Sequence, residues 1–281
     1  MPVLYLVATP IGNLEDVTLR ALRVLREVGL IAAEDTRTTR KLLSRYGIRN
    51  RLLSYNDHNK PQRIPHILAT LEEKDVALVS EAGMPAISDP GYDLVVAAGQ
   101  VGVSVVPVPG PSAVVTALAV SGLPTRRFTY VGFLPRRQGE RRRALTALAH
   151  ETATIVALES PHRLLNTLTD MLAAWGDRRV AVCRELTKAH EEVFRGRLSE
   201  AIEYFQEPRG EFTLVVEGAA SQEAQAGDLK AELRRLRRQG LRAREAVSQL
   251  AAKYGCSHRS LYRLWLELGQ PTKGSAQHDD G

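Results

Sequence analysis

The residues best suited to binding a ligand stand in one run, Ser80-Glu81-Ala82-Gly83-Met84-Pro85-Ala86-Ile87-Ser88-Asp89-Pro90-Gly91. The run follows the apolar segment 76–79, and its glycines and prolines prevent a strand or a helix from continuing. Glycine lets the backbone approach a ligand closely, while Glu81, Ser88 and Asp89 can bond hydroxyl or amino groups. Because α/β proteins place ligand sites at the carboxyl ends of parallel strands, we predict a shaped binding loop here. An ordinary strand-to-helix connection is the simpler alternative, but it needs fewer residues and a single glycine.

Further polar segments stand at the borders of other predicted strands. They are residues 9–13, 34–37, 56–59, 109–113, 159–163 and 211–213. Each alone is more often structural than catalytic, and only their shared position at strand borders favours one assembled site. The chain has no GxSxG, HExxH or P-loop motif, and the turn after the first strand lacks GxGxxG. These absences disfavour a simple NAD dehydrogenase and a P-loop kinase.

Two α/β domains are predicted to position these segments. Strand patterns at 3–8, 30–33, 52–55, 76–79 and 103–108 alternate with helical patterns, which predicts a mainly parallel sheet covered on both faces. We assign residues 1–121 to this first domain. Beyond Gly122-Leu123-Pro124, strand patterns at 128–133, 154–158, 179–184, 192–195 and 212–216 indicate a second α/β domain, residues 122–218. Residues 219–227 are expected to form a linker, and residues 270–281 a disordered tail.

Residues 228–269 indicate a helical module. Apolar residues recur at helical spacing in 243–254 and in 258–268, and Gly255-Cys256-Ser257 separates the two runs. Ser257 would cap the second helix, which carries His258 and Arg259. Two helices joined by a short turn are typical of a helix-turn-helix, although any small helical hairpin shares this spacing.

Positive charge is concentrated in two patches. Residues 126–143 and residues 228–269 each carry a net charge of +6, and since the whole chain is also +6, the remaining residues sum to −6. Such a distribution is expected of a nucleic-acid-binding protein, although solvated helix faces would look similar. An aromatic content of 5% disfavours a sheet that stacks bases.

Composition narrows the class further. A chain of 281 residues with 44% hydrophobic content can bury more than one core, and no stretch of about 18 apolar residues occurs. We therefore expect a cytoplasmic protein without a membrane segment. Cys183 and Cys256 have neither metal-ligand spacing nor a disulfide framework around them, so no metal is expected.

Five motifs stand in order along the α/β region: residues 4–18 (LYLVATPIGNLEDVT), 33–37 (AEDTR), 80–91 (SEAGMPAISDPG), 107–113 (PVPGPSA) and 158–163 (LESPHR). Together they closely resemble the 16S ribosomal RNA 2′-O-ribose cytidine methyltransferases of the tetrapyrrole methylase superfamily. The resemblance extends from about Val3 to Gly218, and the helical module looks like the helix-turn-helix appended in that family.

The resemblance implies S-adenosylmethionine bound between the two α/β domains, usually in a homodimer, and methyl transfer to cytidine-1402 of 16S ribosomal RNA in the small subunit. By motif position, the cofactor pocket would be lined by Ile11, Gly83, Met84, Ile87, Ser112, Ala113, Leu158 and Thr213. Glu81 and Ser88 of the same loop join this set. The family's loop more commonly has aspartate and threonine where this chain has Glu81 and Met84, which removes one side-chain hydroxyl and leaves backbone contacts intact.

Methyl transfer to a ribose hydroxyl is an in-line displacement that needs alignment and one proton acceptor. Glu34, Asp35 and Asp89 are the predicted catalytic residues, with Asp57 and His58 as further candidates. Each of them could instead be a helix cap, a turn residue or an arginine partner. Phosphate contacts are predicted for Arg37, Arg136, Arg137, Arg141, Arg142, Arg143, Arg163, Arg259 and Arg263.

Two alternatives belong to other classes. A small-molecule tetrapyrrole methylase would share the α/β domains, but it has no need of basic patches or a helix-turn-helix. A DNA-binding regulator that senses a ligand would carry its main basic feature in the helical module, whereas here an equal patch lies in the α/β region.

Overall fold

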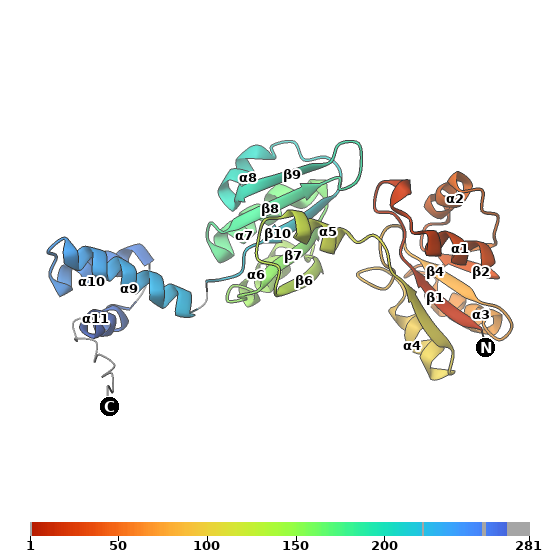
Figure 1. The fold of residues 1–281 in the computed structure, drawn as a ribbon, viewed down its shortest axis with the longest axis horizontal. Helices are drawn as coiled ribbons and strands as arrows, with labels where there is room; N and C mark the ends of the chain where they lie inside the picture. The colour runs from red at the N-terminus through yellow and green to blue at the C-terminus, as the bar shows by residue number, and fades with distance from the viewer. Residues whose placement is uncertain (1, 221, 255–256, 269–281) are drawn as a thin grey trace, which may run out of the picture. The chain divides into compact units, whose positions relative to one another are not determined.

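The computed structural model describes residues 2–220, 222–254 and 257–268. The chain divides after Ala219 into two compact units (Figure 1). The first unit holds both α/β domains, and the second holds the C-terminal helices. No helix within the described ranges has the length and apolar character needed to cross a membrane.

The first sheet is parallel throughout, as the sequence predicted, with strand order β3-β2-β4-β1-β5. Its strands are β1 (Val3–Val7), β2 (Leu30–Ala33), β3 (Leu52–Ser54), β4 (Val76–Val79) and β5 (Ser104–Val108). Its helices are α1 (Leu19–Glu27), α2 (Thr36–Arg45), α3 (Lys60–Thr70) and α4 (Tyr92–Gln100). Parallel pairing brings the carboxyl ends of all five strands to one edge, where the predicted polar segments follow them.

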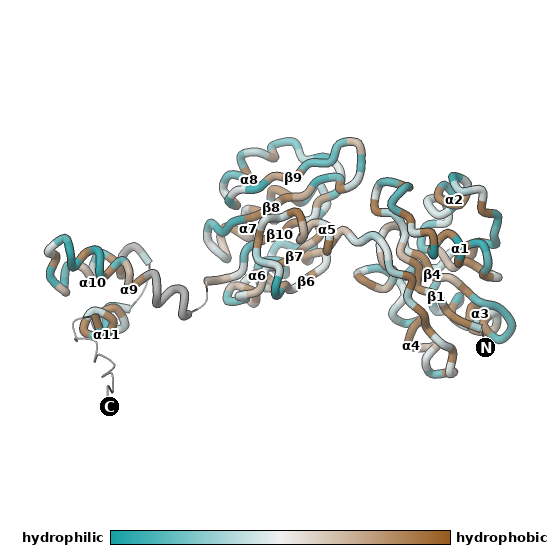
Figure 2. Tube along the Cα trace, viewed as in Figure 1, coloured by the Kyte–Doolittle hydropathy of each residue, from teal (hydrophilic) through white to brown (hydrophobic). Residues whose placement is uncertain are grey.

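Helices cover both faces of this sheet. In β4, Ala77 and Val79 pack with α1 and α2, whereas Val76 and Leu78 pack with α3 and α4. All four side chains are buried, which explains why the strand is a continuous apolar run (Figure 2). The two cores hold the sheet rigid between them, so the loops at its edge start from fixed positions.

The second sheet is mixed, with strand order β6-β7-β10-β8-β9, and only β6 and β7 pair in parallel. Its strands are β6 (Phe128–Phe133), β7 (Thr154–Glu159), β8 (Arg179–Arg184), β9 (Glu192–Arg197) and β10 (Phe212–Val216). Helices α6 (Gln138–Ala147), α7 (Leu164–Trp175) and α8 (Leu198–Tyr204) cover one face. The other face packs against α5 (Ala113–Val120), which the sequence analysis placed in the first domain. By packing, therefore, the joint lies at residues 109–112, before α5 (Figure 1).

The C-terminal unit consists of α9 (Gln222–Arg238), α10 (Ala243–Tyr254) and α11 (His258–Glu267). Leu233, Val247, Leu261 and Trp265 are in its core, and the side chain of Ser257 caps α11 as predicted. Helix α9 begins inside residues 219–227, so the expected linker is mostly helical. The predicted tail, 270–281, and Cys256 lie outside the described residues.

Candidate active site

A pocket of about 1210 Å³ opens at the carboxyl ends of the first sheet. Both α/β domains contribute to its wall, through the loops after β1, β2, β4 and β5 on one side and through strands β6, β7, β8 and β10 on the other. The structure brings all ten residues predicted to contact a cofactor to this wall. They are Ile11, Glu81, Gly83, Met84, Ile87, Ser88, Ser112, Ala113, Leu158 and Thr213.

The loop 80–91 has an unusual backbone that other contacts hold in place. Gly83 has a φ of 79°, and its N–H and C=O exchange hydrogen bonds of 3.0 and 2.9 Å with Thr9 of the loop after β1. Ala86 and Ser88 also have positive φ values, 68° and 63°, which cost side-chain-bearing residues roughly 1–3 kcal/mol each. A strained loop persists only when its surroundings specify it, and such loops are concentrated at functional sites.

Two hydrogen bonds join the first α/β domain to the second beside the pocket. The Ser88 hydroxyl lies 2.8 Å from the Tyr130 hydroxyl of β6, and the Asn13 N–H donates to Thr187 Oγ1 at 3.0 Å. Gly12 lies against the loop between β8 and β9, which contains Thr187, because a Cβ added at Gly12 would stand 2.5 Å from Lys188 Cγ. Ser88 therefore has a structural partner in addition to its place on the pocket wall.

Three carboxylates gather on the first domain's side of the pocket: Glu34, Glu81 and Asp89. Glu34 accepts a hydrogen bond of 3.1 Å from the backbone N–H of Glu81, which ties the loop after β2 to the loop after β4. Burial raises the pKa of Asp89 to about 6, and the negative charge of Glu34 adds to this shift. Burial also raises the pKa of Glu34 above its ordinary value. A carboxylate with a pKa near neutrality is well suited to accepting a proton at physiological pH.

The remaining acid–base candidates do not line the pocket, and the contacts of Asp35 argue against the prediction for it. Its carboxylate caps α2 through the N–H groups of Arg37 and Thr38, and it also pairs with the Arg37 guanidinium. Bonds from Arg37 lower the pKa of Asp35 to about 2, so it is a poor proton acceptor. Asp57 pairs with Lys60, and neither Asp57 nor His58 lines the pocket.

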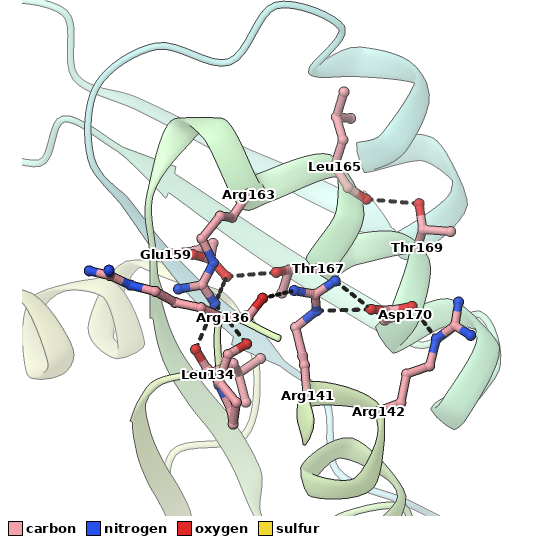
Figure 3. Close-up of polar contacts among 11 residues, drawn as sticks. Leu134, Arg136, Arg141, Arg142, Glu159, Arg163, Leu165, Thr167, Thr169 and Asp170 are labelled. Carbon is pink, nitrogen blue, oxygen red and sulfur yellow. Dashed lines mark hydrogen bonds and ion pairs between the residues drawn. The ribbon is translucent and has the colours of Figure 1, made fainter. Parts of the chain in front are cut away.

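Arg163, for which a phosphate contact was predicted, is mostly buried in the second domain and contacts other residues of that domain (Figure 3). Its guanidinium donates to the carbonyl oxygen of Leu134 at 2.6 Å and lies 3.3 Å from the buried carboxylate of Glu159. Glu159 also accepts a hydrogen bond of 2.6 Å from Thr167. This network fixes the end of β7, where Leu158 and Glu159 line the pocket.

Arg141 is the second arginine with a predicted RNA contact whose side chain lies inside the fold. Its side chain is 5% exposed and pairs at 2.7 Å with Asp170, which is 2% exposed (Figure 3). Arg142 pairs with the other oxygen of Asp170 at 2.8 Å while its own side chain stays 60% exposed. One buried aspartate thus joins α6 to α7, and Arg141 has no face toward solvent.

The other predicted phosphate-binding arginines are exposed. Arg37 and Arg137 are 85% and 86% exposed, although each pairs with a neighbouring carboxylate. The remaining exposed members are Arg136, Arg143, Arg259 and Arg263. Their accessibility leaves them able to contact a polyanion.

Sequence reasoning missed pocket residues that come from the second domain, among them Tyr130, Cys183 and Lys188. Lys188 follows an apolar strand, like the segments that were found, so its position was a usable signal. Tyr130 and Cys183 lie within strands, where periodicity indicates only that they face one side of the sheet. No group of three or more metal-ligating side chains occurs in the part of the chain that the structure describes.

Comparisons with known proteins agree on one family. Residues 3–202 match the model of the tetrapyrrole (corrin/porphyrin) methylases. Two relatives are called ribosomal RNA small subunit methyltransferase I. The one from Halalkalibacterium halodurans is 48% identical, and the match covers 93% of this chain and 94% of the relative. The one from Thermotoga maritima is 55% identical, and the match covers 76% of this chain and 98% of the relative.

Solved structures share the fold at low identity. Uroporphyrin-III-C-methyltransferase from Thermus thermophilus has a TM-score of 0.58 and 22% identity, and covers 77% of this chain and 94% of its own. Diphthine synthase has a TM-score of 0.60 and 15% identity, over 76% and 90%. A further Thermus thermophilus uroporphyrin-III C-methyltransferase, complexed with S-adenosylhomocysteine, has a TM-score of 0.56 and 22% identity, over 76% and 97%.

Proposed function

Because this chain belongs to the tetrapyrrole methylases and, within them, to the ribosomal RNA small subunit methyltransferase I family, we propose that it methylates the small-subunit ribosomal RNA with S-adenosylmethionine as its cofactor. We place the reaction at the ribose 2′-hydroxyl of a cytidine, cytidine-1402 of 16S ribosomal RNA. The observation that carries the proposal is the single pocket formed by all ten predicted cofactor residues beside a carboxylate of raised pKa.

The pocket suits S-adenosylmethionine in its chemistry. Its wall combines apolar side chains such as Ile11 and Leu158 with close backbone approach at Gly83, which fits a neutral adenosine. Glu34, Glu81 and Asp89 supply negative charge that would favour a bound cation. When bound, the cofactor supplies an electrophilic methyl group on a sulfonium.

The chain's own residues would orient the reactants and accept one proton. Backbone groups at Thr9 and Gly83 are fixed by their mutual hydrogen bonds, so the pocket is preorganised at this point. We assign Asp89 as the proton acceptor, because it lines the pocket and its pKa of about 6 leaves it ionised at neutral pH. Glu34 acts through Asp89 and the Glu81 backbone, and is a positioning residue.

We further propose a cytoplasmic homodimer. Tyr92 and Val96 of α4 lie outside the pocket wall and are 71% and 39% exposed in the single chain, and a second copy would cover such apolar side chains. Sedimentation velocity at several protein concentrations distinguishes a dimer from a monomer.

The reaction is tested with purified small subunits from cells that lack this protein. Incubation with methyl-labelled S-adenosylmethionine should label 16S ribosomal RNA, and mass-spectrometric mapping should place the label on one cytidine ribose. Label on a base, on another nucleotide or on an added uroporphyrin instead of RNA would contradict the proposal. Naked 16S RNA in parallel reactions shows whether the assembled subunit is required.

A further inference from the structure

The C-terminal unit contains a pocket of about 350 Å³ with a basic and aromatic wall. Arg244 and Val247 of α10 line it together with His258, Arg259 and Tyr262 of α11. Among the residues that the structure describes, no carboxylate belongs to this wall. Within the described residues, neither Arg244 nor Arg259 has an ion-pair partner, whereas Arg235 and Lys230 of the same unit are both paired with glutamates.

Of the side chains in this wall, only Val247 belongs to the core of the unit, so packing does not require the two arginines, the histidine and the tyrosine. Its core is built from residues such as Leu233, Leu261 and Trp265, and the Trp265 ring is covered by Arg237 at 5.3 Å. Tyr262 is 48% exposed and lies outside this core. A phenol ring half open to solvent offers a flat face to a ligand, and the two guanidinium groups beside it, which have no ion-pair partner in the described part of the chain, offer positive charge.

The positive charge at this place also opposes the stability of its own helix. Helix α11 begins at His258, and its first turn holds Arg259 but no acidic residue. Cations are unfavourable at the positive end of a helix dipole, where acidic side chains are preferred. A helix that only had to pack would therefore carry a different residue here, and an anionic ligand would remove the cost.

The shape of the site favours an unpaired nucleotide over a duplex. A helix-turn-helix reads duplex DNA by inserting a protruding helix into the major groove. A hollow between two helices, lined by tyrosine and arginine, instead matches the way proteins hold single-stranded RNA, with bases stacked on aromatic rings and phosphates bound by arginine.

We propose that this pocket, formed by Arg244, Val247, His258, Arg259 and Tyr262, binds a nucleotide of a single-stranded RNA segment. The base stacks on Tyr262 above the apolar Val247 side chain, and Arg244 and Arg259 hold the flanking phosphate. This inference rests on the proposed function, since it names the part of the substrate that the C-terminal unit holds.

The test uses the full chain and a short, fluorescently labelled single-stranded RNA of mixed sequence. Tyr262→Leu should weaken binding roughly 5- to 100-fold, the loss expected for one base–aromatic stack, and Tyr262→Phe should retain it. Arg259→Ala should weaken binding and reduce the salt dependence of log Kd by about one ion. Arg234→Ala is the matched control, because Arg234 is an exposed arginine of the same unit that does not line the pocket.

Methyl transfer to small subunits by the same proteins separates the two proposals. If the unmodified enzyme does not methylate ribosomal RNA, the proposed function fails whatever the oligonucleotide shows. If it does, and Tyr262→Leu and Arg259→Ala change neither RNA affinity nor KM beyond the Arg234→Ala control, the pocket assignment is overturned. Preferential binding of a DNA duplex would also overturn it, in favour of groove recognition.

Discussion

Aspartates in the two α/β domains are in opposite environments. Asp89 of the first domain lies in the pocket wall among other carboxylates, and its pKa is raised to about 6. For Asp170 of the second domain, burial raises the pKa, but bonds from Arg142 and Arg141 outweigh this effect and hold it below its ordinary value. Negative charge is therefore exposed to a ligand in one domain and neutralised by arginine in the other. The contrast teaches that the partners of an aspartate, and not its residue type, decide whether it can accept a proton.

The largest effect in this comparison is expected for Asp170→Ala. The change leaves the buried Arg141 without a carboxylate partner and with only the Arg136 carbonyl as an acceptor, and breaking a buried ion pair typically costs about 3–5 kcal/mol. Urea denaturation should show a lower midpoint with an unchanged slope. Arg142→Ala removes only the exposed partner and should cost less than about 1 kcal/mol. Equal losses in the two variants would show that Asp170 does not anchor Arg141 in the way described.

Asp89→Asn is expected to lower kcat by about 10²- to 10⁴-fold, the usual effect of losing a general base. In the unmodified enzyme, kcat/KM should fall as pH drops below about 6, because Asp89 becomes protonated. The variant should lack this inflection. A retained inflection at the same pH would assign the proton to another group.

The same variant has a stability signature of defined sign. Because the folded pKa of Asp89 lies above its unfolded value of 3.8, the native state binds the extra proton and loses stability as pH rises from about 4 to 6. Asp89→Asn should therefore be more stable than the unmodified protein at neutral pH, and the difference should vanish below about pH 4. A variant that is less stable at neutral pH would contradict this environment for Asp89.

Contacts across the pocket should give intermediate effects. Gly12→Ala places a Cβ 2.5 Å from Lys188 Cγ and 2.8 Å from the carbonyl oxygen of Leu186. The loop after β1 and the loop between β8 and β9 must therefore move apart. Overpacking of this kind costs about 1–3 kcal/mol. We expect the variant to bind S-adenosylmethionine more weakly, as measured by calorimetry. Gly139→Ala is the control, since a Cβ there meets nothing within 4 Å. Unchanged affinity in Gly12→Ala would show that this contact does not shape the pocket.

The smallest effect is expected for Tyr130→Phe, which removes one hydrogen bond to Ser88 and keeps the ring. A loss of about 0.5–1.5 kcal/mol corresponds to a few-fold rise in the KM for S-adenosylmethionine. Ser88→Ala should have a similar effect, and the double variant should be no worse than either single one. Additive losses would mean that the two hydroxyl groups act independently.

Local sequence was enough to predict the strand β4 and the shaped loop after it. Of the ten residues predicted for the pocket wall, all but Glu81 and Ser88 were placed there by their positions in motifs that resemble the methyltransferase family. An apolar run that meets glycine and proline must end there, and parallel strands bring such ends together. The same alternation could not reveal that the second sheet is mixed, because strand direction depends on which strands pair. For the same reason it placed α5 with the wrong sheet.

Only the tertiary structure could show which charged side chains are exposed and which are buried or paired. A run of seven arginines and one glutamate in residues 126–143 indicates a basic surface, yet Arg141 is buried against Asp170, a residue 29 positions later. Asp35 and Asp89 are likewise the same residue type at equivalent strand ends, and only their neighbours make one a helix cap and the other a candidate base. The sequence by itself determined where polar side chains gather, because that follows from local patterning. Their protonation and availability depend on burial and partners, which the folded chain alone supplies.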